Sequence, residues 1–172
     1  MKGVSLDYYL RRALYWRLSQ LELSAFDPSI APDAFFTLDS TQIPILSTYV
    51  DKDYPYPYLY IGDIEVGDFS AKNRHGMTGT VEFLFLDRGT SVKRAYDVLS
   101  LIYRGLQDFS FDFSLFNETK KVVNQETNME EEVTTLDLSS VQIVNFKLSA
   151  KNVNIVDKDL ISGSESFQFT VI

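Results

Sequence analysis

A strand followed closely by an amphipathic helix constrains the fold of this chain more than any other feature. In residues 80–87, Val81, Phe83 and Phe85 alternate with their neighbours, which is the period of a β-strand. In residues 91–107, apolar residues recur at every third or fourth position, which is the period of a helix with one buried side. Together with a strand that precedes them, these segments predict one unit of strand, hairpin, strand and helix.

The segment before this unit predicts the first strand of the hairpin. Pro55 and Pro57 hold their neighbours extended, and residues 58–66 follow as a strand in which we expect a bulge near Gly62. Residues 67–79 contain three glycines among polar residues and are too many for a tight hairpin turn. We therefore predict a protruding, mobile loop between two paired strands.

The N-terminal residues predict a second amphipathic helix. It covers residues 6–23, with Ser5 as its N-cap. Arg11, Arg12 and Arg17 lie mostly off its apolar stripe. We interpret these arginines as a solvated face, with contact to an acidic neighbouring subunit as the alternative.

The remaining patterns complete an α+β domain. Pro44 limits any strand in residues 43–50 to an edge or a short extended piece. Residues 141–148 and 166–172 predict two strands that pair antiparallel with the central hairpin. The predicted fold is a mostly antiparallel sheet of about four to five strands, with two amphipathic helices packed on one face and a long protruding β-hairpin loop.

The chain is interpreted as a single domain over residues 1–172. Two segments depart from the regular patterns. Residues 24–50 include an irregular, proline-punctuated stretch over 24–42, and residues 108–135 pass from an aromatic patch to a polar stretch. Both are interpreted as insertions or loops, and for the second we expect partial order and a second hairpin.

Charge and composition argue against several classes of protein. The chain carries a formal net charge of −8 and has a pI near 4.6, unlike proteins that follow nucleic-acid phosphates or adhere to anionic membranes. The lack of cysteine removes disulfides, thiolate metal sites and cysteine nucleophiles. There is no signal-peptide core and no apolar run long enough for a bilayer, so we expect a soluble protein made in the cytosol.

The sequence contains no constellation that is typical of catalysis. His75, the only histidine, lies in the predicted loop without a nearby nucleophile or orienting group, and is interpreted as a surface residue. The acid pairs Asp51/Asp53 and Asp157/Asp159 lack the spacing of a full calcium loop and are interpreted as turn residues. We predict no enzyme, no cofactor and no metal, with a small carboxylate-dependent hydrolase as the alternative.

Two groups of residues are candidates for contacts with other proteins. The first consists of polar residues of the predicted loop: Lys72, Asn73, Arg74 and His75. The second consists of phenylalanines that follow the second helix: Phe109, Phe111 and Phe113. These rings either close the core beneath that helix or dock on a partner subunit, and both interpretations stay open.

The order of these elements resembles the phage tail-completion proteins, also called tail-terminator proteins. The resemblance rests on the helix at 6–23, the Pro-Tyr entry at Pro57-Tyr58, the glycine-containing loop, the strand at 79–86 and the helix beginning at 91–99. Two closing strands complete it. Most of the chain is covered, the middle third most specifically, and the two segments interpreted as insertions depart from the family pattern.

The resemblance implies a structural virion protein of a phage, located in the tail or neck. It implies a ring of identical subunits, typically a hexamer, at the head-proximal end of the tail tube. Such a ring ends tube polymerisation and contacts the tail tube protein and the head-closure or connector protein. DNA passes through it without specific binding, and an acidic protein is compatible with that. The alternative in the same class is another neck or head-closure component, a stopper or an adaptor.

Overall fold

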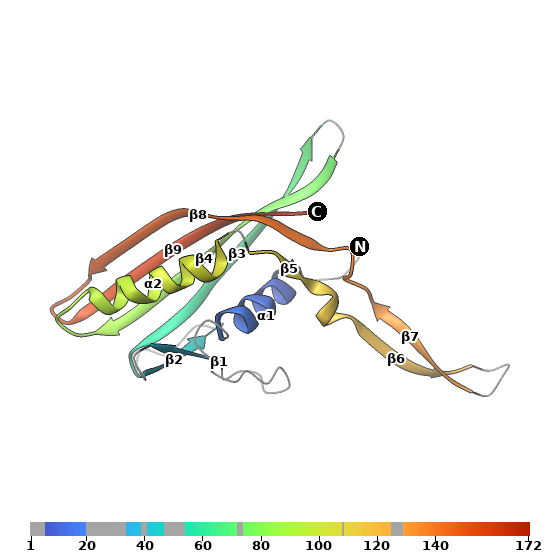
Figure 1. The fold of residues 1–172 in the computed structure, drawn as a ribbon, viewed down its shortest axis with the longest axis horizontal. Helices are drawn as coiled ribbons and strands as arrows, with labels where there is room; N and C mark the ends of the chain where they lie inside the picture. Colours follow the sequence, from blue (N-terminus) through green and yellow to red (C-terminus); the bar gives the residue numbers. More distant parts are fainter. Residues whose placement is uncertain are drawn as a thin grey trace.

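The structure is a computed structural model that describes residues 6–19, 34–38, 41–46, 54–71, 74–107, 109–124 and 129–172. In chain order the elements of these residues are α1 Leu6–Ser19, β1 Ala34–Leu38, β2 Thr41–Leu46, β3 Tyr58–Ala71, β4 Arg74–Arg88, α2 Lys93–Leu106, β5 Phe111–Asp112, the 3-10 helix η1 Phe113–Phe116, β6 Glu118–Val123, β7 Glu130–Leu136, β8 Gln142–Ile155 and β9 Leu160–Val171. Figure 1 shows a long twisted sheet with both helices lying along it, and the β6–β7 hairpin extending away from it.

One large sheet organises the described residues. Its strand order is β1-β2-β3-β4-β9-β8-β5, and its strands pair antiparallel except between β2 and β3. The predicted α+β class and the antiparallel pairing of the C-terminal strands with the central hairpin are confirmed. Seven strands take part where four or five were predicted, because β1, β2 and β5 are too short to leave a clear alternating pattern.

The β3–β4 hairpin is paired much further than the sequence predicts. β3 continues to Ala71 and β4 begins at Arg74, and the ladder runs without interruption from Val66↔Gly79 to Ala71↔Arg74. The prediction of an unpaired loop over residues 67–79 is therefore wrong for the part that the structure describes. Backbone hydrogen bonds between the strands need no apolar side chains, so this pairing left no hydrophobic pattern in the sequence. The predicted protrusion is visible where the hairpin projects beyond the neighbouring strands (Figure 1).

Arg11 of α1 reinforces an irregularity in β3. The expected bulge near Gly62 is confirmed, because the register with β4 shifts between Ile61 and Ile64. The Arg11 guanidinium donates to the carbonyl oxygens of Ile61 at 2.6 Å and Gly62 at 2.9 Å. A bulge interrupts the regular ladder, and the guanidinium supplies donors to its carbonyls. The interpretation of this arginine as part of a solvated face is wrong.

The other two arginines of α1 also contact the body of the protein. Arg17 Nε donates to the carbonyl oxygen of Gly105 at 2.9 Å, and its guanidinium carbon lies 4.0 Å from the centre of the Phe109 ring. The guanidinium carbon of Arg12 lies 5.2 Å from the centre of the Phe116 ring. These hydrogen bonds and cation–π contacts fasten α1 to α2 and η1. The solvated-face interpretation is wrong here too, since all three arginines are half-buried.

The core lies between the two helices and one face of the sheet. In β9 every second residue from Ile161 to Val171 is buried, whereas the residues between them lie on the opposite face. The predicted apolar stripe of α2 is confirmed by its buried residues: Ala95, Val98, Leu99, Ile102, Gly105 and Leu106. The helix passes so close to the sheet that a Cβ at Gly163 would lie 3.1 Å from Leu99 Cδ1. Phe146 and Phe167, with ring centres 5.1 Å apart, stack in the middle of this layer.

The two segments interpreted as insertions contribute paired strands. β1 and β2 extend the sheet, and among the described residues β2 pairs with β3 through Ile45 and Leu46, after Pro44. The expectation of irregular structure is wrong for β1. β2 is short, as one alternative for the strand at Pro44 predicts, but the edge alternative is wrong, because β2 lies between β1 and β3 and Pro44 pairs with Phe35. β6 and β7 form a separate two-stranded antiparallel sheet, which confirms the expected second hairpin. The Ser5 cap, residues 20–23, and Asp51 and Asp53 lie outside the described residues, and the single-domain interpretation stays a prediction.

Candidate interaction surfaces

The face of the sheet opposite the helices, called the open face below, is polar along β9, and β4 adds both polar residues and the half-buried Leu84 and Leu86 to it. In β9 the residues on this face are Ser162, Ser164, Ser166, Gln168 and Thr170. Across the ladder, β4 places Glu82 and Thr80 beside Ser166 and Gln168. Hydroxyl, amide and carboxylate groups therefore dominate this part of the surface. It provides hydrogen-bonding groups and negative charge, but not the basic face that phosphate binding needs.

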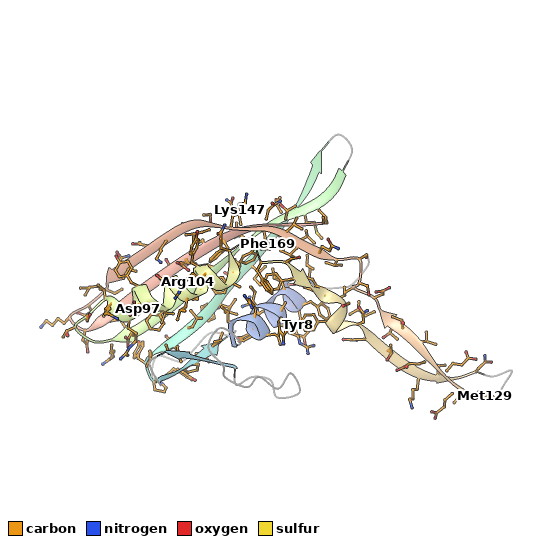
Figure 2. The ribbon with its side chains drawn as sticks, in the orientation of Figure 1. Tyr8, Asp97, Arg104, Met129, Lys147 and Phe169 are labelled. Atoms are coloured by element: carbon orange, nitrogen blue, oxygen red, sulfur yellow. The ribbon has the colours of Figure 1, made fainter. Side chains whose placement is uncertain are left out.

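A shallow groove of about 630 Å³ lies on the open face where the β3–β4 hairpin leaves the sheet. Its lining includes Glu65, Thr80, Asn145, Lys147 and Gln168. Lys147 is exposed and projects from the sheet surface in Figure 2. The groove lining carries one acid, Glu65, and one cation, Lys147, among hydroxyl and amide groups. It is suited to contact with another polar surface.

The tip of the β3–β4 hairpin was predicted as an interface. Lys72 and Asn73 lie outside the described residues. Arg74 and His75 begin β4, with backbones paired to Ala71 and Ser70. The structure thus places these two residues at the outer end of the projecting hairpin, and their role in contacts stays a prediction.

The phenylalanines after α2 lie in or against the core. Phe111 is 3% exposed and Phe113 is fully buried. Phe109 is half-buried, with its ring centre 4.9 Å from that of Phe111 and the Arg17 guanidinium over its face. This arrangement agrees with the interpretation that the rings close the core, and only Phe109 offers part of its ring to a partner. Docking of these rings on another subunit stays a prediction.

Glu165 is a charged residue that sequence reasoning missed. It lies in β9 on the face that the helices cover, and it is fully buried. Lys151 Nζ on β8 lies 3.0 Å from its Oε1, although neither carboxylate oxygen has a well-aligned hydrogen-bond donor among the described residues. Burial raises the pKa of Glu165 to about 7, and the ammonium group of Lys151 opposes the rise. The alternation of Phe167, Phe169 and Val171 could have revealed its position, because Glu165 continues their face.

Asp157 and Asp159, which the sequence predicts as turn residues, behave as turn and surface groups. Asp157 Oδ1 accepts a hydrogen bond from the backbone N–H of Lys158 at 2.7 Å, as the turn interpretation requires. Asp159 lies 3.6 Å from Arg88 in an exposed ion pair. Within the described ranges no group of three or more histidine, cysteine or acidic residues is arranged to hold a metal ion. No described helix combines the length and apolar character needed to cross a membrane.

Comparison with solved structures shows that this fold has a counterpart. The chain superposes with a TM-score of 0.58 on a chain of a structure described as the virion of a native gene transfer agent (GTA) particle. The superposition covers 98% of this chain and 98% of the other, at 13% sequence identity. No protein-family model and no curated protein sequence matches the chain. The likeness therefore concerns the fold, over the whole length of both chains.

Proposed function

We propose that the protein is a structural component of a phage-like virion, and that it forms a terminator ring at the head-proximal end of a tail tube. The observation that carries the proposal is the likeness to a virion chain over 98% of both lengths. A match of this extent includes the projecting and peripheral parts of the fold as well as its core. The proposed role is one of assembly and involves no catalysis.

The surfaces of the molecule support assembly into a ring. A closed ring requires contacts in which two different faces of one subunit meet, so that each copy binds the next through a rotation. The β3–β4 hairpin and the β6–β7 hairpin project from different parts of the molecule (Figure 1). Projections that point in different directions provide distinct surfaces for a neighbouring copy, for the tail tube protein and for the head-closure or connector protein.

The charge of the chain supports a channel through which DNA moves. The net charge is −8, and on the open face of the sheet the exposed acids Glu65 and Glu82 outnumber the exposed cation Lys147 near the groove. Phosphates are repelled by such a surface, so DNA passes without being held. The proposed ring therefore has no DNA-binding role of its own.

Assembly and tube capping test this proposal together. Size-exclusion chromatography with light scattering across concentrations is expected to reveal a closed oligomer, with annular particles in electron micrographs. Addition of the protein to polymerising tail tube protein is expected to limit tube length, while an equal amount of an unrelated acidic protein leaves the length distribution unchanged. A protein that stays monomeric at high micromolar concentration and does not shorten tubes would overturn the proposal.

The same likeness supports a second virion role, that of a head-closure component such as a stopper or an adaptor. The two roles differ in the structure that the protein binds first. A terminator binds the end of a purified tail tube, whereas a head-closure component binds emptied capsid connectors. Sedimentation of the protein with each particle separately distinguishes them.

A further inference from the structure

Two acidic side chains of the described residues are buried on the helix-covered face of the sheet, and they differ in their partners. Asp87 of β4 accepts hydrogen bonds from Arg94 at both carboxylate oxygens, at 3.2 Å, and from the backbone N–H of Arg88 at 2.8 Å. Among the described residues, Glu165 of β9 has no well-aligned donor to either oxygen, and it forms an ion pair with Lys151 at 3.0 Å. A buried polar group without an aligned donor calls for an explanation.

A bulge in β8 places Lys151 opposite Glu165. The register of β8 with β9 shifts between Leu148 and Ala150, and beyond this shift Lys151 is the direct partner of Glu165. In a regular ladder that continued from Leu148, Ala150 would take that place and Lys151 would lie on the open face. Bulges commonly redirect a side chain in this way. The pairing of this cation with the buried acid is therefore a consequence of the bulge.

The ammonium group of Lys151 has a route to solvent, whereas the carboxyl of Glu165 has none. In the part of the chain that the structure describes, the outer side of β8 is paired at Gln142 and Ile143, by β5, and Lys151 lies beyond them at the edge of the sheet. The lysine side chain is 29% exposed and the glutamate side chain is fully buried. Rotation of the lysine side chain into water would therefore break no backbone pairing.

We propose that Lys151 and Glu165 form a clasp that closes when the carboxyl loses its proton and opens when the carboxyl regains it. The charged carboxylate attracts the ammonium group strongly in apolar surroundings and holds it against the sheet. When the carboxyl takes up a proton from solvent, this attraction is lost. The lysine side chain then moves into water, where its charge is hydrated and more rotamers are accessible.

Burial places the opening of the clasp near neutral pH. It raises the pKa of Glu165 from an ordinary value of 4.5 to about 7, and the ammonium group of Lys151 opposes the rise. Both forms of the carboxyl are therefore populated around pH 7, the open form below it and the closed form above it.

The other elements packed around Glu165 present no further charged group to it within the described ranges. Its neighbour on β4 is Phe83, and Lys147 of β8 pairs with Gln168 on the open face. The residues that α2 buries are apolar or glycine: Ala95, Val98, Leu99, Ile102, Gly105 and Leu106. The charged and phenolic residues of α2 lie outside this buried set: Lys93, Arg94, Tyr96, Asp97, Tyr103 and Arg104. The clasp therefore consists of two residues.

The two states present different charges at the edge of the sheet. In the closed state the pair is neutral as a whole, and the ammonium group is turned toward the carboxylate. In the open state the ammonium group of Lys151 is in solvent and the carboxyl beside it is uncharged. The surface charge at this edge therefore becomes more positive as the pH falls through 7. This inference goes beyond the proposed virion role and applies to a single chain.

Amine labelling provides the test, because it compares Lys151 with a second lysine of the same strand. A brief pulse of an acetyl N-hydroxysuccinimide ester, followed by tandem mass spectrometry, measures how far each lysine reacts. Lys147 is exposed on the opposite face, so the ratio of Lys151 to Lys147 labelling cancels the general effect of pH on lysine reactivity. The pulse is applied at a concentration at which light scattering gives one particle mass at every pH. The ratio is expected to fall several-fold between pH 6 and pH 8.

Three variants assign the effect to the clasp. Glu165→Gln removes the titrating group with little change in shape, so its ratio should stay at every pH near the value of the unaltered protein at pH 6. Glu82→Gln removes an exposed acid on the open face and should leave the fall in the ratio unchanged. Lys151→Met removes the cation, and ¹³C NMR of the Glu165 carboxyl should show a titration midpoint at higher pH than in the unaltered protein.

The contrary results are equally clear. A ratio that stays constant from pH 6 to pH 8 in the unaltered protein would overturn the clasp, whether Lys151 stays held or stays reactive. A fall that persists in the Glu165→Gln variant would also overturn it, because another group would then control the lysine. An unchanged midpoint in the Lys151→Met variant would show that the ammonium group does not act on the carboxylate in solution. The terminator ring is tested separately, by assembly and tube capping.

Discussion

Lys151 Nζ lies 3.0 Å from Oε1 of the fully buried Glu165, on neighbouring strands whose Cα positions are directly paired. The lysine reaches solvent with part of its side chain, while the carboxylate is enclosed between β9 and the helical layer. A buried ion pair of this kind recovers only part of the cost of removing a carboxylate from water. The titration of the Glu165 carboxyl should therefore contribute to the pH dependence of the free energy of unfolding.

We expect Glu165→Gln to remove a pH-dependent part of the stability. The pKa of the carboxyl is about 7 in the folded protein against an ordinary value of 4.5, so folding favours the protonated form. The stabilising contribution is fully present below about pH 4.5 and is lost as the pH rises through about 7. Relative to Glu165→Gln, the unaltered protein should lose roughly 2–3 kcal/mol between pH 4.5 and pH 8.

Urea unfolding at several pH values measures this difference. Glu82→Gln, which changes an exposed acid on the opposite face of the sheet, is the matched control and should follow the unaltered protein. Identical pH profiles for the Glu165→Gln variant and the unaltered protein would show that the buried carboxylate does not titrate in this range.

Gly79→Ala should destabilise the hairpin at its base. A Cβ at this position would lie 2.6 Å from the carbonyl oxygen of Glu65 and would collide with the ring of Phe169. Since a backbone atom and a core ring cannot both move aside cheaply, we expect a loss of about 1–3 kcal/mol in the free energy of unfolding. Gly67→Ala is the control, because a Cβ there has no atom within 4 Å. Equal stabilities of the two variants in chemical denaturation would contradict this prediction.

Phe113→Ala should reduce the stability of the monomer itself. The ring is fully buried, with its centre 6.2 Å from that of Phe116, so its removal leaves a cavity and is expected to cost about 3–5 kcal/mol. Phe109→Ala removes a half-buried ring beneath Arg17 and should cost less, about 1–2 kcal/mol. Thermal unfolding under conditions where the protein is monomeric separates these effects from assembly. If the Phe113→Ala monomer is as stable as the unaltered monomer, the predicted role of this ring in the core is contradicted, and contact with a partner becomes the better interpretation.

Arg94→Gln should destabilise the start of α2 more than Lys93→Gln. Arg94 lies 3.2 Å from both carboxylate oxygens of Asp87, whose side chain is buried, whereas Lys93 pairs with Asp97 in an exposed position. Loss of the first pair leaves a buried charge and should cost about 1–2 kcal/mol, because Arg94 itself is partly solvated. Loss of the second should cost at most about 0.5 kcal/mol. Unfolding of both variants at low and high salt provides the measurement.

The features predicted correctly from the sequence are those that neighbouring residues determine. The alternation around Phe83 and the helical stripe of α2 were read correctly, because a single face buried against the core imposes a regular period on the chain. The bulge near Gly62 and the hairpin of β6 and β7 also followed from local residues. These features depend on neighbours within one element or on a short turn.

The errors occurred where a residue's partner lies far along the chain. Arg11 looked like a surface residue because it is off the apolar stripe, but a bulge fifty residues away supplies its acceptors. The pairing of residues 67–71 with 74–79 rests on backbone hydrogen bonds, which any side chain permits. Phe109, Phe111 and Phe113 had two open interpretations, since an aromatic patch is the same in sequence whether a core or a partner covers it.

By itself, the sequence determined the α+β class, the position of α2, the bulge in β3 and the antiparallel character of the sheet. These features follow from the regular spacing of apolar residues, which arises because each helix or strand buries one face. Only the tertiary structure decided the order of the sheet strands, the burial of Glu165 beside Lys151, and the separation of the β6–β7 hairpin from the main sheet. Those features depend on which distant segments pack against each other. Such contacts impose no regular spacing of apolar residues on either segment, so neither segment reveals them by itself.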